Sequence, residues 1–233
     1  MQDKLHLVKV SFSRPNPLPK PKTLLHATEE GSPKDADMTE KNDTLALMVR
    51  QGLPDDLRIL VQKYPRADWG VVHRLGDLGR FWIERHDMFR ELGGALVASI
   101  EDLREGRVET RTFAPWFARR LNHFLGDLEG HHQIEDHQYF PLFAAADARL
   151  APGFELLEQD HDLIHTLLGR NAEAANAFYS ELMAGGDRLD FARDAYAVEA
   201  QGLLMGLLRH LEDEEDLLIP LLLDQGERKF GGY

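Results

Sequence analysis

The chain has 233 residues, a formal net charge of −13 and no cysteine. Without cysteine there can be no disulfide, thiolate nucleophile or iron–sulfur cluster, so any metal must be held by His, Asp or Glu. The negative charge argues against nucleic acid or an anionic membrane as the main partner. No run approaches the roughly 18 apolar residues of a membrane span, and the N-terminus has no stretch typical of a signal peptide. We therefore expect a cytoplasmic protein.

Residues 1–45 differ in composition from the rest of the chain. They contain the proline-rich run PNPLPKPKT and a dense polar run, EEGSPKDADMTEKND. Such segments bury too little apolar surface to form a packed core, so we expect an extended or disordered arm. For residues 46–70 we expect a short helical segment that packs on the following domain, since Pro54 suits the first turn of a helix.

Residues 71–225 contain four long segments with helical periodicity. The breaks between them, 105–112, 147–153 and 185–187, are rich in Gly, Pro or polar residues. Connections this short join antiparallel neighbours, and no segment shows the period-2 alternation of a strand. The sequence therefore predicts an all-α fold, an up-down-up-down four-helix bundle, followed by a tail at 226–233.

The buried seam of each predicted helix is apolar except near its middle. Read in steps of three and four, the seams are interrupted only by imidazoles and carboxylates. These residues are His86 on the first helix, His131 and Glu135 on the second, His161 and His165 on the third, and His210 and Glu214 on the fourth. Buried groups of this kind are costly unless they are paired or bound to a cation. The pattern predicts a metal centre, and N and O ligands suit iron, manganese or zinc.

The seams also contain an internal repeat. The segment from His131 to Pro141 matches the segment from His210 to Pro220, and a His-Asp pair precedes each copy at a similar distance. We interpret this as two related helix hairpins around a pseudo-twofold axis. Such an arrangement would place one metal ion mainly with each half. Arg90 stands where the second half has His165, so the two ions should have unequal surroundings.

These motifs resemble the hemerythrin or HHE cation-binding family over about residues 71–223. The matching features are a single His on the first helix, His-x-x-x-Glu on the second, His-x-x-x-His on the third, and His210 with Glu214 or Glu215 on the last. The resemblance implies two iron ions bridged by two carboxylates and an oxo or hydroxo group, although another divalent metal could bind. It also implies an open position for O2, NO or peroxide.

Several assignments stay open at this stage. Glu214 mirrors Glu135 in the repeat, but Glu215 also lies on an apolar seam and could instead tune a histidine ligand. His132 and Asp136 lie one position off the seam, where they could form a hydrogen bond to a metal ligand, face solvent or pair at a helix interface. His123 is expected to belong to a charged face. A ferritin-like scheme would use Glu129 with His132 and Glu158 with His161, but it leaves most of the seam residues unexplained.

The function expected from these residues is a di-iron protein that binds O2, NO or a related small molecule as a carrier or sensor. Many imidazoles and few carboxylates favour the lower oxidation states of iron. The alternative is a di-iron enzyme that acts on peroxide or NO, or in the repair of iron or nitrosative damage. The repair role is known in relatives whose N-terminal domain carries a cysteine, which this chain lacks. A third possibility is an interaction protein that reports metal or oxygen status to a partner; no protein partner or reductase can be named.

Overall fold

The computed structural model describes residues 7–8, 44–69 and 75–232. Within these ranges the chain is helical and contains no strand. The long helices are α2 (Asp77–Arg104), α3 (Thr110–Ile134), α5 (Ala151–Ala184) and α6 (Leu189–Gln225). The shorter ones are η1 (Arg66–Asp68), η2 (Glu135–Tyr139), α4 (Phe140–Ala146) and η3 (Glu227–Phe230). The prediction of an all-α protein is confirmed.

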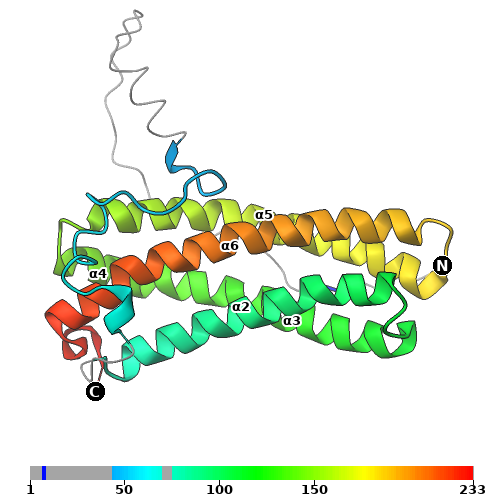
Figure 1. The fold of residues 1–233 in the computed structure, drawn as a ribbon, viewed down its shortest axis with the longest axis horizontal. Helices are drawn as coiled ribbons and strands as arrows, with labels where there is room; N and C mark the ends of the chain where they lie inside the picture. The colour runs from blue at the N-terminus through cyan, green and yellow to red at the C-terminus, as the bar shows by residue number, and fades with distance from the viewer. Residues whose placement is uncertain (1–6, 9–43, 70–74, 233) are drawn as a thin grey trace, which may run out of the picture.

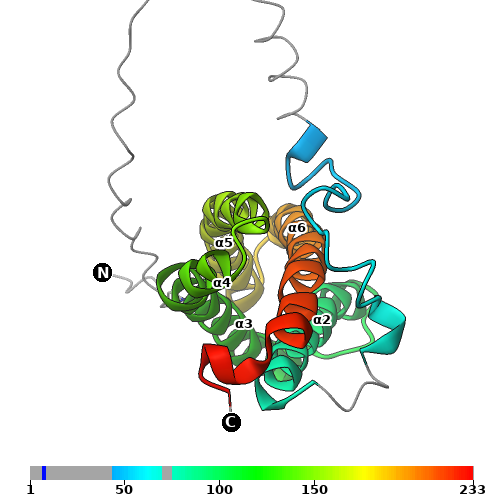
Figure 2. The same ribbon diagram turned by 90° about the vertical axis from the view of Figure 1, so that its left-hand side faces the viewer.

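The four long helices form an up-down-up-down bundle (Figures 1 and 2). Helix α2 packs against α3 and α6, and α5 packs against the same two helices. The loops between them fall at the predicted breaks, where Gly185 adopts the left-handed backbone conformation (φ 62°) that ends α5. Most of the predicted arm, residues 1–45, lies outside the described residues.

The second helix of the bundle is interrupted, although the sequence pattern predicted one continuous helix between the breaks at 105–112 and 147–153. A π-helical turn, η2, separates α3 from α4. Pro141 lies at the start of α4 and has no N–H to donate to the carbonyl four residues earlier, so the regular helical ladder cannot continue through this point. Single π-turns of this kind occur often at functional sites, and this one begins at Glu135.

Two apolar cores fill the bundle, with a polar layer between them. One core contains Phe117, Phe178 and Tyr196, and the other contains Phe140, Phe154 and Leu217. Along α2, α5, α6 and the combined length of α3 and α4, the seam passes from one core, through buried polar residues, into the other core. The apolar groups on both sides hold the helices in register and exclude water from the layer between them.

Residues 44–69 lie along the bundle as a series of turns. Instead of the helix expected at 46–70, the described residues 46–69 form turns, with η1 as the one helical element among them. Leu47 is buried against the first core, whereas Leu53 and Leu60 are buried against the second. No helix in the described ranges is long and apolar enough to cross a membrane.

The C-terminal tail caps the first helix of the bundle. The carboxylate of Glu227 accepts hydrogen bonds from the backbone N–H groups of Gly76 (2.6 Å), Leu78 (2.9 Å) and Gly79 (3.1 Å). These N–H groups have no partner inside α2, and the negative charge also complements the positive end of the helix.

We therefore expect Glu227→Ala to destabilise the protein by about 1–2 kcal/mol, the usual range for loss of an N-terminal cap. Urea denaturation of the metal-free protein measures the change. The matched control is Glu155→Ala on α5, an exposed glutamate whose loss should change the free energy of unfolding by less than about 0.5 kcal/mol. Equal stability of the two variants would contradict the capping role.

Candidate metal centre

The polar layer contains two groups of side chains whose nitrogen and oxygen atoms converge. The first group is His86, His131, Glu135 and Glu214, and the second is His132, Glu135, His161 and His210. In each group one potential ligand atom per residue lies within 4.8 Å of all the others, and every member is buried. Glu135 belongs to both groups, so the two form one centre with contributions from α2, η2 and α3, α5 and α6.

Helix α2 supplies one imidazole to the first group and α3 supplies the second. The Nε2 atoms of His86 and His131 are 3.3 Å apart, and Glu135 Oε1 lies 2.8 Å from His131 Nε2. Trp82 Nε1–H donates a hydrogen bond to Glu214 Oε1 at 2.5 Å, which fixes that carboxylate. The ring of Phe89 packs beside His131, with 5.2 Å between the ring centroids.

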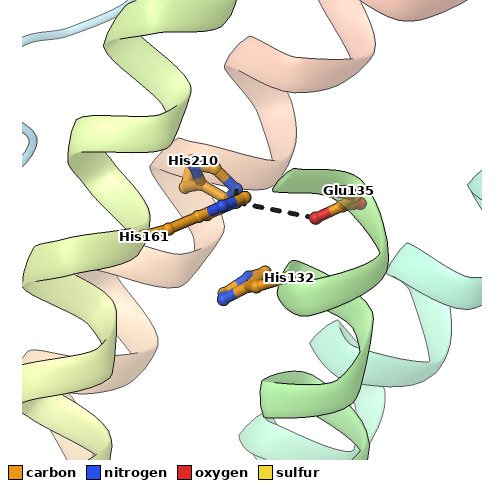
Figure 3. Close-up of side chains that lie close together, drawn as sticks. All are labelled: His132, Glu135, His161 and His210. Carbon is orange, nitrogen blue, oxygen red and sulfur yellow. Dashed lines mark hydrogen bonds and ion pairs between the residues drawn. The ribbon is translucent and has the colours of Figure 1, made fainter. Parts of the chain in front are cut away.

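The second group is shown in Figure 3, where four side chains from α3, η2, α5 and α6 point toward one another. The Nε2 atoms of His161 and His210 are 3.0 Å apart, and His161 Nε2 lies 3.5 Å from Glu135 Oε2. The ring of His132 stacks on that of His161, with 4.0 Å between centroids and 14° between planes.

Two carboxylates lie between the imidazoles of the two groups. Glu135 reaches His131 with one oxygen and His161 with the other. Glu214 Oε2 lies 3.4 Å from His86 Nε2 and 3.7 Å from His210 Nε2. Two ligands held about 2 Å from one ion are themselves separated by about 3–4 Å, so the two oxygens of Glu135 could each serve one of two cations, whereas Glu214, although near His210, belongs to the first group.

The imidazole pair of His161 and His210 is arranged to accept a positive charge. The Nδ1 of His161 lies 2.6 Å from Asp136 Oδ1, and the Nδ1 of His210 lies 3.2 Å from Asp160 Oδ2. Carboxylates only accept, so we assign the protons to both Nδ1 atoms. The two Nε2 lone pairs then face each other across 3.0 Å. Burial lowers the pKa of His210, which disfavours a shared proton and favours a cation.

Burial and the neighbouring charges shift the pKa values of the titratable side chains in the polar layer. Burial lowers the pKa of His131 to about 3 and that of His132 well below its usual value, so both imidazoles are neutral and able to bind a metal. Burial, reinforced by Glu214, raises the pKa of Glu135 well above normal. At His86 burial opposes the charged form, but Glu214 and Glu215 outweigh it and raise the pKa to about 9. Without a metal, a proton on His86 thus supplies the positive charge that this site requires.

Carboxylates outside the two groups orient their imidazoles and preserve the internal repeat. His86 Nδ1 lies 3.0 Å from Glu215 Oε1, and His161 Nδ1 lies 2.6 Å from Asp136 Oδ1. In the repeat, Glu215 corresponds to Asp136 as His86 corresponds to His161. The two hairpins therefore hold equivalent histidines through equivalent carboxylates. Such partners select the tautomer that leaves Nε2 free for a metal.

The structure brings together six of the seven residues that the sequence pattern singled out. The seventh, His165, is in neither group; one turn beyond His161, its Nδ1 lies 3.1 Å from Glu129 Oε2. His132, which the sequence pattern did not predict as a metal ligand, belongs to the second group. Because His132 follows His131 directly, steps of three and four skip it, and only its failure to fit a solvent-facing pattern could have revealed it.

The other open assignments also have positions. Glu214 faces the metal groups while Glu215 holds His86, and Arg90 lies 2.7 Å from Glu215 Oε1. Glu129 pairs with His165 and Glu158 is exposed, so the ferritin-like carboxylate set is not assembled. His123 is exposed and pairs with Asp127 at 3.3 Å, as expected for a charged face.

Unsatisfied polar atoms show that the layer fits a pair of cations. His132 Nε2, both carboxylate oxygens of Glu135 and Glu214 Oε2 are buried without a hydrogen bond to any described residue. Leaving such atoms unpaired is costly, whereas a bound cation satisfies imidazole and carboxylate together. The donors are all imidazole nitrogen or carboxylate oxygen, the set that suits iron, manganese or zinc.

We expect Glu135→Ala to reduce the metal content below that of the native protein, because it removes the carboxylate common to both groups. Metal analysis of protein produced with excess iron measures the stoichiometry. His123→Ala is the control and should keep the native content. Equal metal content in the two variants would contradict the assignment of Glu135.

The choice between His132 and His165 has its own test. We expect His132→Ala to weaken the binding of one ion by at least about tenfold, and His165→Ala to change it much less, since a ligand should matter at least as much as the groups that orient it. Competition with a chelator measures both affinities. A larger loss for His165→Ala would exchange the roles of the two residues.

Comparison with known proteins agrees with this geometry. No curated protein and no solved structure gives a significant match to the chain. The family model described as hemerythrin HHE cation binding domain matches residues 77–222, which is more than half of the sequence and spans all four bundle helices and both metal groups. The chain therefore belongs to the hemerythrin HHE cation-binding domain family.

Proposed function

We propose that this protein holds two iron ions and uses them to bind O2, NO or a related small molecule, as a carrier or sensor. The observation that carries the proposal is the composition of the polar layer. Five imidazoles (His86, His131, His132, His161 and His210) and only two carboxylates (Glu135 and Glu214) converge in it. Neutral nitrogen ligands in excess of carboxylates favour the reduced ions that bind these gases.

In this proposal the two groups hold unequal ions. The first would have two imidazoles and two carboxylates, and the second would have three imidazoles with Glu135. Bound iron supplies open coordination positions and one-electron chemistry to an incoming molecule. The difference in ligands gives one ion more carboxylate charge than the other, so the small molecule should prefer one of the two.

The surroundings favour binding over rapid turnover. Aromatic rings enclose the polar layer: Phe140 stacks on His161, and Phe89 and Trp82 pack beside His131. Apolar walls let a small uncharged molecule enter but exclude bulk water. The carboxylates Asp136, Asp160 and Glu215 are occupied in orienting imidazoles, which keeps them from acting as mobile proton carriers.

We expect the visible absorption of the iron-loaded, dithionite-reduced protein to change when O2 or NO is added, with one molecule bound per centre. The original spectrum should return when the gas is removed. Stopped-flow and equilibrium spectroscopy measure the change, and Glu135→Ala is the control that should lack it. An iron-loaded protein without any response would contradict the proposal. Sustained consumption of peroxide or NO with an electron donor would instead support the enzyme alternative.

A further inference from the structure

The segment of residues 44–69, here named the strap, lies on the outside of the bundle beside α6 (Figures 1 and 2). Leu47 anchors it in one apolar core and Leu53 anchors it in the other. Arg50 lies between these two anchors. The strap therefore repeats the order of the bundle helices, apolar then polar then apolar, and places a guanidinium where they place their imidazoles.

Arg50 is buried between two carboxylates. Its Nε donates to Asp213 Oδ2 at 2.7 Å and its Nη1 donates to Asp160 Oδ1 at 2.8 Å, while Nη2 forms a second bond to Asp160. Its side chain is only 1% exposed. A guanidinium that grips one carboxylate with two nitrogens fixes the orientation of that carboxylate, which a lysine could not do equally well.

Asp160 passes this orientation to the centre. The oxygen of Asp160 that pairs with Arg50 Nη2 also accepts from His210 Nδ1 at 3.2 Å. Asp213 also holds the strap on α6, because it accepts hydrogen bonds from the backbone N–H of Leu53 (3.2 Å) and from Arg209 (2.7 Å). A continuous chain of contacts thus runs from the strap through Asp160 to His210.

A similar chain reaches the other half of the centre. Arg66 Nη1 donates to Glu215 Oε2 at 2.6 Å, and Glu215 Oε1 lies 3.0 Å from His86 Nδ1. Here the strap shares the carboxylate with Arg90 of α2. Among the described residues, Arg50 is the one arginine that pairs with Asp160, so the orientation of Asp160 depends more on the strap than that of Glu215 does.

We propose that the strap is a working part of the metal centre, and that Arg50 is a positioning residue that controls how firmly the ion beside His210 is held. This inference rests on the metal centre proposed above. When the strap is docked, Asp160 is locked and His210 presents Nε2 to the ion. When the strap leaves, Asp160 is free to turn away, and the second ion is released or exchanged more readily than the first. By linkage, metal binding must stabilise the docked strap to the same extent.

The test uses the full-length protein loaded with Co²⁺, whose visible bands report its surroundings. Release into excess chelator is followed for the native protein and for Arg50→Gln, Asp160→Asn, the double variant and Arg58→Gln. Arg58 is the matched control, since it lies on the strap and pairs with Asp55 and Asp216 but touches no carboxylate that holds a histidine.

We expect Arg50→Gln and Asp160→Asn each to speed the release of one of the two ions by about 10–100-fold, the usual effect of removing a partner of a metal ligand. The double variant should be no faster than the faster single variant, because both changes act on His210. Arg58→Gln should release like the native protein. Release from Arg50→Gln at the Arg58→Gln rate, or equal acceleration of both ions, would overturn the positioning role.

A second measurement needs no substitution and decides the matter should Arg50→Gln fail to fold. Hydrogen exchange in residues 44–69 of the native protein should slow when Co²⁺ binds, while exchange at the distant start of α3, residues 110–118, stays the same. Unchanged exchange in the strap would overturn the inference but leave the metal centre intact. A native protein that retains no Co²⁺ would instead remove the centre and the inference together.

Discussion

The structure depends on one electrostatic constraint: a layer of imidazoles and carboxylates lies in the dry interior of a helical bundle. The Nε2 atoms of His161 and His210 face each other at 3.0 Å while their Nδ1 atoms point at carboxylates. With protons on both Nδ1 atoms, donated to those carboxylates, the two Nε2 lone pairs face each other, and a bound cation or a shared proton relieves their repulsion. The apolar cores on either side exclude bulk water, so the layer must balance its own charge, through a bound cation or through protons.

Other features of the fold follow from this need. Trp82, Asp136, Asp160 and Glu215 each fix one group of the layer, and the arginines of the strap fix two of these carboxylates in turn. Arg50 thus orients His210 through Asp160, and Arg66 orients His86 through Glu215. Under the inference drawn above, the same hydrogen bonds would couple metal binding to the docking of a segment outside the family domain.

Much of this was predictable because helical periodicity makes buried polar residues conspicuous. The four helices, their breaks and six members of the centre follow from apolar seams interrupted by His or Glu. His132 was not predicted as a ligand because it follows His131 directly, and helical periodicity places only one of two adjacent residues on the buried seam. His165 shares a helix face with His161, but spacing cannot show that Glu129 on α3 is there to pair with it. Residues 46–70 were expected to be helical; the described residues 46–69 form turns instead, and Pro54 and Pro65 lack the N–H that a continuous helix would need there.

The central claim is that the polar layer holds two unequal metal ions. Anaerobic titration of the metal-free protein with Fe²⁺, monitored by calorimetry, tests it most directly. The account predicts two ions per chain with different affinities, because one group offers two imidazoles and two carboxylates and the other offers three imidazoles with the shared Glu135. Two distinguishable binding steps would support it. A single ion per chain, or no measurable binding, would contradict it.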